Sequence, residues 1–530
     1  MFRLWTKRQG EHPGKRSEKG ALCRAMAWQE TAEWCALCIL ILIGFVVRLS
    51  FLSAPILYDE AYTFTQYASK PLYVGLTDYS APNNHLFHTS LVHVAYRLLG
   101  NEPWMIRLPA LVAGIFLIPA AYWTTRLIYN RHAALLTAAC VACSAPLVRY
   151  SVLARGYSVL CLIFMLLLGV AARLQGGAGK KRWLLFSVLA ALGFYTIPVM
   201  LYPFGMVVVW LILSIVFDHR GEGSTLSVAG LMGSLAMVGV LTFALYLPVF
   251  VMSGFQTVFA NDMVSPKSWG LLATKLPASL GSIWGDWNKE IPYWLSGGLL
   301  FGFVISLIFH RRLSPYRVPV LAGGILWIIP AVLVQRVIPP VRAWLFLLPL
   351  YFAMASAGLG AVVEGATAKL GRMRVAAIPV LSITLAVLMA REVSQVKYIY
   401  DPIGTLWEGE QIALFLKDYL EPGDKVVVPH ASAVMLYYFI LHGVPTEYLE
   451  QGPNRGSRIV LVVCESKGRL EDNLRRQGAS LRERMDALFP DFGPPQQLRR
   501  YEFSTVYELR RKSPPDVIEE ARDNSQKSLR

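Results

Sequence analysis

Charged side chains are scarce in this chain. Asp, Glu, Lys and Arg make up 16% of its 530 residues, whereas apolar residues make up 55% and the mean hydropathy is +0.43. This composition is too apolar for a soluble enzyme of this size and indicates a membrane protein. Runs of about 20 apolar residues cross a bilayer as helices, and we expect such spans near 34–54, 107–127, 133–149, 157–173, 182–198, 199–217, 227–252, 292–309, 318–336, 341–361 and 374–391.

Cysteine is also rare, with seven residues in the whole chain. Five of them lie in the expected spans: Cys35, Cys38, Cys140, Cys143 and Cys161. The two Cys-x-x-Cys spacings have no His or acidic companions within their spans, which favours packing in the core over metal ligation. The pattern implies no disulfide.

Acidic residues are outnumbered by basic ones, 35 against 51, which gives a formal net charge of +16. In a soluble protein this excess would suggest a nucleic-acid partner, but here the basic residues lie mainly in short loops between spans. Such loops mark the cytoplasmic side of a membrane protein. We therefore expect no nucleic-acid partner and place these segments in the cytoplasm: 1–24, Arg126/Arg131, Arg173 to Arg182, Arg220, Arg311/Arg312/Arg317 and Lys369/Arg372/Arg374.

The weakly apolar stretch His85–Gly100 fits this alternation only if it does not cross the membrane. It contains three histidines and Arg97, which are unfavourable against lipid. We expect it to form a helix that lies in, or dips into, the outer surface. The outer segments are then 55–106 and 253–291, and the C-terminus is outside.

The predicted fold class is an α-helical polytopic membrane protein of about 11 spans with a small C-terminal extracytoplasmic α/β domain. In that domain Val426–Val428, Ile459–Val463 and Thr505–Leu509 favour strands, whereas Ser432–His442 and Gly468–Ala487 favour helices. The predicted divisions are a basic cytoplasmic arm (1–30), a transmembrane catalytic domain (31–391), the extracytoplasmic domain (392–512) and a disordered tail (513–530).

An acidic pair, Asp59-Glu60, follows the first apolar span directly. Carboxylates at the membrane surface cost free energy unless they are hydrated, paired or used. On the same predicted outer side stand only a few arginines: Arg107, Arg149, Arg155, Arg336 and Arg342. A phosphate near the membrane surface would explain them, because guanidinium groups bind phosphate oxygens in a bidentate manner. Snorkelling to lipid headgroups is the alternative for any single arginine.

The order of these motifs resembles the polyprenyl-phosphate-dependent membrane glycosyltransferases of the GT-C fold. The chain is similar to protein O-mannosyltransferases and to the bacterial lipid A aminoarabinose transferase group, over residues 35–360. The motifs that carry the resemblance are the first span, Asp59-Glu60, Asn83-Asn84-His85-Leu86 and the segment Ile106-Arg107-Leu108-Pro109-Ala110-Leu111-Val112-Ala113-Gly114.

The resemblance implies a catalytic role for two residues, Asp59 as the base and Glu60 as its companion. It implies substrate binding by His85, Arg107, Arg155, Tyr157 and Arg342. His85 stands where the family has His-Pro-Pro or Lys-Pro, but both prolines are absent here. The segment Arg155-Gly156-Tyr157 stands where many relatives have an Asp, so a second acidic group is missing.

No metal ligand is predicted. His85, His88 and His93 share part of a helical face, but no acidic residue lies at helical spacing among them. Relatives differ in metal dependence, so a divalent cation stays open and no cofactor is assigned.

The residues and the resemblance predict transfer of a sugar, hexosyl or pentosyl, by direct displacement from a polyprenyl-phosphate donor of the undecaprenyl type, with inversion at the anomeric carbon. The acceptor would be a glycan, lipid or protein outside the cytoplasm, and the enzyme would lie in the bacterial inner membrane with its N-terminus in the cytoplasm. Two alternatives are a transporter or flippase of lipid-linked sugars and a non-catalytic assembly protein of the cell envelope.

Overall fold

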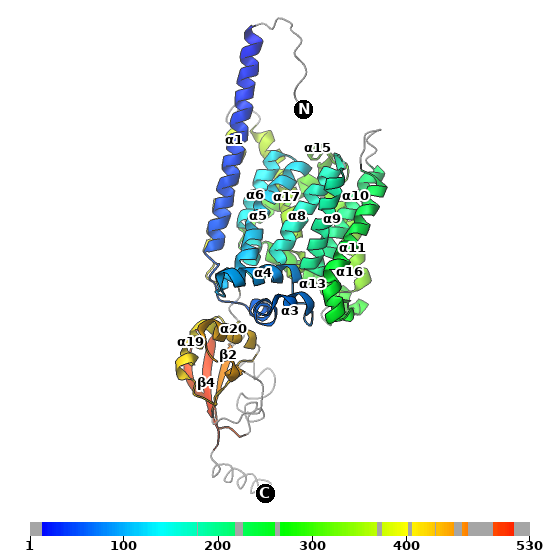
Figure 1. The fold of residues 1–530 in the computed structure, drawn as a ribbon. Helices are drawn as coiled ribbons and strands as arrows, with labels where there is room; N and C mark the ends of the chain where they lie inside the picture. The colour runs from blue at the N-terminus through cyan, green and yellow to red at the C-terminus, as the bar shows by residue number, and fades with distance from the viewer. Residues whose placement is uncertain are drawn as a thin grey trace.

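The computed structural model describes residues 13–177, 179–217, 226–259, 265–367, 374–400, 405–429, 431–449, 458–464 and 491–512. A helical bundle makes up most of these residues, and a small sheet domain follows it in the chain (Figure 1). The predicted N-terminal arm up to residue 12 and the predicted tail from residue 513 lie outside the described residues.

Helices lie over all eleven predicted spans, and at one of them two helices, α6 and α7, form a bent pair. These helices are α1 (Pro13–Leu49), α5 (Pro103–Ile128), α6 (Arg131–Cys143) with α7 (Ala145–Ser151), α8 (Tyr157–Gln175), α9 (Lys180–Thr196), α10 (Leu201–Phe217), α11 (Val228–Met252), α14 (Tyr293–Ile308), α16 (Val320–Gln335), α17 (Leu347–Ala366) and α18 (Arg374–Ser394). Within the described residues, seven helices are long and apolar enough to cross a membrane, or eight if the bent pair α6–α7 is one span. The helices α14 and α16 are apolar but shorter.

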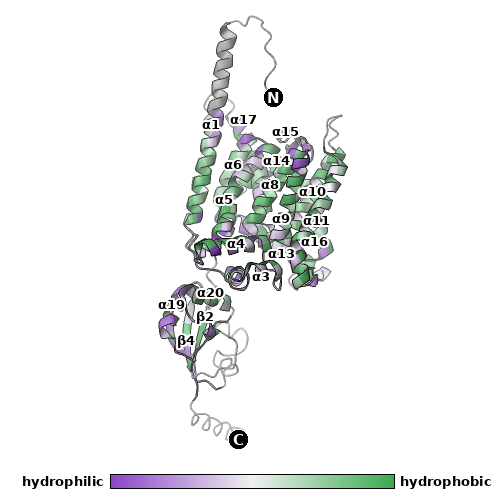
Figure 2. Ribbon diagram, in the orientation of Figure 1, coloured by the Kyte–Doolittle hydropathy of each residue, from purple (hydrophilic) through white to green (hydrophobic). Residues whose placement is uncertain are grey.

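Hydrophobic residues cover the bundle along its length, and hydrophilic residues gather at its two ends (Figure 2). The centre is built from α5, α6, α8 and α17, and most of their small residues are buried. Cys140, Cys143 and Cys161 belong to this core, whereas Cys35 and Cys38 lie exposed on α1. Large apolar side chains on the outer helices are also exposed, as expected for surfaces that face lipid.

Four short elements lie at one end of the bundle: α2 (Tyr58–Thr63), the π-helix η1 (Phe64–Ala68), α3 (Leu72–Thr77) and α4 (Leu86–Leu99). The helix α4 lies across this end of the bundle rather than along it (Figure 1), as the sequence predicts for His85–Gly100. We call this end the α4 end. The opposite end carries α15 (His310–Leu313), and we call it the α15 end.

The segment 253–291, predicted as a loop, contains two helices, α12 (Gln256–Phe259) and α13 (Trp269–Trp287). Most of α13 is exposed, and only Leu272 and Ile283 are buried. Two short 3-10 turns connect spans: η2 (Pro198–Met200) lies between α9 and α10, and η4 (Val341–Trp344) precedes α17 and contacts α13.

The C-terminal domain contains a four-stranded sheet of order β1-β2-β4-β3. Its strands are β1 (Lys425–Val427), β2 (Arg458–Cys464), β3 (Gln496–Arg500) and β4 (Ser504–Arg510), and its helices are α19 (Gly409–Tyr419), α20 (Ser432–His442) and η6 (Thr446–Leu449). The strand β1 pairs parallel to β2, and the other two pairs are antiparallel. The three predicted strands and the helix α20 are therefore present. The prediction missed β3 and α19, and the helix predicted at 468–487 lies outside the described residues.

The domain packs against the α4 end through α20, which contacts α2 and η1. The Tyr437 hydroxyl donates to the carbonyl of Asn101 at 2.5 Å. The Tyr438 hydroxyl accepts a hydrogen bond from the backbone N–H of Ile56 at 3.1 Å. The two parts of the chain thus share one hydrophobic core directly beside the acidic pair.

Candidate active site

Asp59 and Glu60 lie in the first turn of α2. The backbone carbonyl of Asp59 accepts hydrogen bonds from Thr63 Oγ1 at 2.8 Å and from Asn83 Nδ2 at 3.0 Å. No described residue donates a hydrogen bond to the Asp59 carboxylate, which is partly exposed. The backbone at Asp59 is therefore fixed, while its carboxylate stays available to a substrate.

Glu60 points the other way and forms a buried ion pair with Arg107. Both side chains are 0% exposed, with Arg107 Nε 2.9 Å from Oε1 and Nη2 2.8 Å from Oε2. The remaining guanidinium N–H groups donate to the carbonyls of Leu52, Ala54 and Pro55 at 2.6–3.1 Å. All five N–H donors of Arg107 are therefore engaged within the protein, and none is left for a phosphate.

Glu60 also anchors a second segment. Its Oε1 accepts from the backbone N–H of Ala154 at 2.6 Å, and its Oε2 accepts from the N–H of Leu57 at 3.0 Å. Ala154 belongs to the loop 152–156 that joins α7 to α8. The pair thus ties this loop to the start of α2.

Arg155 follows in the same loop and is 4% exposed. Its Nη1 donates to Thr63 Oγ1 at 3.0 Å and to the carbonyl of Asn83 at 2.8 Å, the two residues that hold the Asp59 carbonyl. Its Nη2 lies 3.2 Å from His85 Nε2, and its Nε–H has no partner among the described residues. Arg155 is therefore near Asp59 and retains donor capacity.

His85 meets hydrogen-bond donors at both ring nitrogens. Its Nδ1 accepts from the backbone N–H of Gly156 at 2.9 Å, so in the neutral ring the proton lies on Nε2. Burial and the nearby charge of Arg155 lower the pKa of His85 well below its usual value, which favours the neutral ring. The His85 Nε2–H and an Arg155 Nη2–H therefore lie side by side, and no described residue accepts a hydrogen bond between them. An anion such as phosphate would satisfy both donors.

Tyr157 and Arg342 complete the cluster. Arg342 Nε donates to the Tyr157 hydroxyl at 3.0 Å, and the Tyr157 ring meets the His85 ring edge-on with centroids 5.2 Å apart. Arg342 is partly buried and lies close enough to Asp59 for their charges to interact. No described residue accepts from its Nη1 or Nη2, so these donors are available to a ligand.

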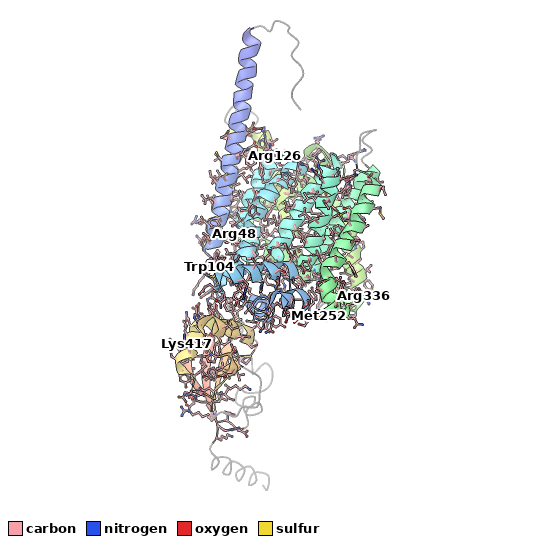
Figure 3. The ribbon with its side chains drawn as sticks, viewed as in Figure 1. Arg48, Trp104, Arg126, Met252, Arg336 and Lys417 are labelled. Carbon is pink, nitrogen blue, oxygen red and sulfur yellow. The ribbon has the colours of Figure 1, made fainter. Side chains whose placement is uncertain are left out.

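The two other outer-side arginines have partners elsewhere. Arg149 Nη1 forms an ion pair with Asp286 at 3.0 Å, and its Nε donates to the carbonyl of Ile399 at 3.1 Å. Arg336 lies over the ring of Trp269, 5.8 Å from its centroid, at the α4 end of the bundle (Figure 3). These contacts explain both arginines without a phosphate.

The three histidines of α4 and its N-cap do not form a metal set in this structure. His93 Nδ1 lies 2.8 Å from the carbonyl of Ala68, and His88 is fully buried with neither ring nitrogen hydrogen-bonded. Over the described ranges, no three His, Cys, Asp or Glu side chains come together.

Sequence reasoning missed three contributors to the cluster. Thr63 lies one helical turn after Asp59, and Asn83 lies two residues before His85 in the motif that carried the resemblance. Tyr150 packs on Tyr157 with ring centroids 5.2 Å apart. Thr63 and Asn83 could have been found from their spacing to Asp59 and His85. No motif in the sequence around Tyr150 indicates that it belongs to the cluster.

Comparison with known proteins places this geometry in context. A family model described as Dolichyl-phosphate-mannose-protein mannosyltransferase matches residues 86–246. A search of curated proteins found no match to the chain.

Solved structures match over nearly the whole chain. ArnT from Cupriavidus metallidurans in the apo state has a TM-score of 0.55 at 13% identity and covers 92% of this chain and 98% of its own. The same protein bound to undecaprenyl phosphate has a TM-score of 0.55 at 13% identity, with 89% and 97% covered. At this identity the likeness establishes the fold. The chain therefore has the GT-C fold of membrane glycosyltransferases that use polyprenyl-phosphate-linked sugars, as its motifs predict.

Proposed function

We propose that this protein transfers a sugar from a polyprenyl-phosphate donor, of the undecaprenyl type, to an acceptor hydroxyl or amine with inversion at the anomeric carbon. One observation carries the proposal: the Asp59 carboxylate has no hydrogen-bond partner among the described residues, and its charge interacts with that of Arg342. Arg155 and His85 belong to the same cluster, and their donors, like those of Arg342, are not fully used. A base next to an unoccupied group of anion-binding donors suits a reaction in which phosphate leaves.

In the proposed step Asp59 takes the proton from the acceptor O–H or N–H. The acceptor's electron pair forms the new bond to the anomeric carbon while the bond from that carbon to the phosphate oxygen breaks. The phosphate keeps the electron pair, and its growing charge is met by N–H donors of Arg155, His85 and Arg342. A single base suffices, because phosphate leaves without a strong general acid, unlike the leaving groups of glycosidases.

The Glu60–Arg107 pair supports this chemistry indirectly. It fixes the start of α2 against the loop 152–156, and so fixes Asp59 relative to Arg155. A catalytic group that is held by packing and hydrogen bonds of its neighbours needs no reorganisation during the reaction.

We further propose the bacterial inner membrane as the location, with the α4 end and the C-terminal domain outside the cytoplasm. The support is the distribution of charge. Arg126, Arg173 and Arg311 lie at or beside ends of helices at the α15 end, as the positive-inside bias predicts for a cytoplasmic face. The sugar could be a hexose or a pentose, and the acceptor a glycan, a lipid or a protein.

The test uses the purified protein in liposomes that contain polyprenyl-linked sugars and envelope extract from the native membrane. Release of free undecaprenyl phosphate, measured by mass spectrometry, reports transfer whatever the acceptor is. We expect release by the wild type, loss of release in Asp59→Asn and normal release in Asp418→Asn, the same chemical change at an exposed acid on α19. A wild type without release contradicts the proposed reaction, and an active Asp59→Asn variant contradicts the role of Asp59.

The same variants separate the alternatives. A flippase moves lipid-linked sugars without releasing the carrier phosphate, so Asp59→Asn would leave its transport unchanged. An assembly protein would show neither activity.

A further inference from the structure

The helices α6 and α7 are two parts of one apolar segment that is bent by 59°. The break falls at Ser144, which has extended backbone angles, and Pro146 follows it at the start of α7. Proline has no N–H, so the carbonyl of Ala142, four residues earlier, cannot receive its usual helical hydrogen bond. Within a membrane such a carbonyl must find another donor in the protein.

Arg48 of α1 supplies that donor. Its Nη1 donates to the carbonyl of Ala142 at 2.6 Å and to that of Gly44 at 2.9 Å, and its Nη2 lies 3.4 Å from the carbonyl of Val141. The side chain is 0% exposed, although it belongs to a helix whose other faces point outward. Arg48 lies in the last turn of α1, at the end of this helix that is nearest α4 (Figure 3).

A buried arginine within a membrane span is costly and usually has a function. The bonds of Arg48 go to backbone carbonyls, and no acidic side chain pairs with it among the described residues. Arg48 therefore serves as a hydrogen-bond donor to the unpaired carbonyls of a broken helix and not as a substrate-binding group.

The segment beyond the break leads directly to the candidate site. The helix α7 carries Arg149, which is tied to Asp286, and Tyr150, which packs on Tyr157. The next residues are the loop 152–156, which is held by Glu60 through Ala154 and contains Arg155. The direction in which α7 leaves α6 thus decides where Arg155 lies.

Close packing fixes α7 on the other side. Gly114 of α5 leaves room for Ser151, and a Cβ at position 114 would clash with the Ser151 side chain and would lie 3.3 Å from Arg48 Nε. The break therefore lies between α1 and α5, with Arg48 bonded to its carbonyls and Gly114 packed on the helix that follows.

We propose that Arg48 is a positioning residue for the transfer reaction, because it stabilises the Pro146 break and thereby holds α7 and the loop with Arg155 in their place. This inference rests on the proposed function for its effect on activity, but the stabilisation of the break can be measured without it. Arg48 itself contacts no part of the candidate site.

The test is a double-mutant cycle with Arg48→Met and Pro146→Ala. The first change leaves the carbonyls of Val141 and Ala142 without a donor, so we expect the melting temperature in detergent to fall by several degrees. The second change restores an N–H four residues after Ala142, so the double variant can continue the helix through the break. We expect its melting temperature to return close to the wild-type value.

Binding and turnover should not return with stability. A helix that continues through residue 146 moves α7 and the loop, so the double variant should bind undecaprenyl phosphate roughly tenfold more weakly and turn over up to about 100-fold more slowly. Arg48→Lys retains a donor for the Ala142 carbonyl and should be intermediate in all measurements. The control is Arg126→Met at the α15 end, where Arg126 donates to Tyr122, and its affinity for the lipid should be unchanged.

Three outcomes overturn the inference. They are an unchanged melting temperature in Arg48→Met, a double variant that is not restabilised, and a restabilised double variant with wild-type affinity for undecaprenyl phosphate. A wild type that does not bind or release the lipid contradicts the proposed function instead. In that case the two melting-temperature measurements still test whether Arg48 stabilises the break.

Discussion

Substitution of Arg107 distinguishes a positioning role from phosphate binding. In Arg107→Lys the ammonium group has three donors in place of five, and it cannot reproduce the bidentate contact with Glu60. At least two of the carbonyl and carboxylate acceptors around it then lose their partner in a fully buried environment. Arg107→Met goes further, since it leaves the Glu60 carboxylate buried without a counter-charge.

The expected magnitude follows from this environment. Breaking a buried ion pair by removing one partner costs about 3–5 kcal/mol of folding free energy. We expect Arg107→Met to lower the melting temperature by about 5 °C or more, on the scale of about 2 °C per kcal/mol for large domains. The double variant Arg107→Met/Glu60→Gln should recover part of that loss, because the remaining partner is then neutral.

The assay is thermal unfolding of the detergent-purified variants, followed by undecaprenyl phosphate binding on the fraction that remains folded. Arg107→Lys should be less stable than the wild type. The reasoning is refuted if Arg107→Lys melts like the wild type but no longer binds the lipid, since that result would make Arg107 a phosphate ligand.

Three further predictions concern the surroundings of the site. In Gly156→Ala the new Cβ would lie 2.9 Å from Thr196 Cγ2 and 3.1 Å from His85 Nδ1, so the His85 ring and the Thr196 side chain must shift. We expect about tenfold weaker binding of undecaprenyl phosphate, and an unchanged affinity would show that the position of the His85 ring does not matter. Burial, with the charge of Arg155, lowers the pKa of His85 well below its usual value and that of His88 to about 3. The unfolded chain therefore binds protons to these two rings below pH 6.5, whereas the folded chain does not. The free energy of unfolding should be constant above pH 6.5. Below pH 6.5 it should fall by up to about 1.4 kcal/mol per pH unit for each ring. Melting curves between pH 5 and 8 check this, and a flat profile contradicts it. Tyr438→Phe removes the hydroxyl that accepts a hydrogen bond from the backbone just before the acidic pair. The change should lower the free energy of unfolding by about 1–3 kcal/mol and slow turnover. A variant with wild-type melting temperature and activity would contradict the link between the C-terminal domain and the site.

The fold was largely predictable from the sequence because the spans are long and apolar. Length and hydropathy suffice to locate such helices, and the histidines of His85–Gly100 correctly excluded that stretch as a span. The helix α13 was missed because its apolar residues are interrupted by Pro277 and by exposed polar positions. The edge strand β3 was missed because four of its five residues are Gln or Arg.

The candidate site was only partly predictable. Asp59, His85, Arg155, Tyr157 and Arg342 do come together in the structure. The buried ion pair and backbone contact of Glu60 could not be predicted from the sequence, because its partners lie 47 and 94 residues away in the chain. A sequence pattern identifies a charged residue at the membrane surface, but only the folded structure decides whether that charge is already neutralised.

The central claim is that the carrier phosphate binds beside Asp59, and a structure of the protein with undecaprenyl phosphate tests it most directly. We predict phosphate oxygens within hydrogen-bond distance, about 2.7–3.2 Å, of Arg155 and of His85 Nε2, with the Asp59 carboxylate across the position of the anomeric carbon. A phosphate bound at another end of the bundle, or one that contacts Arg107 in place of Arg155, would contradict the account.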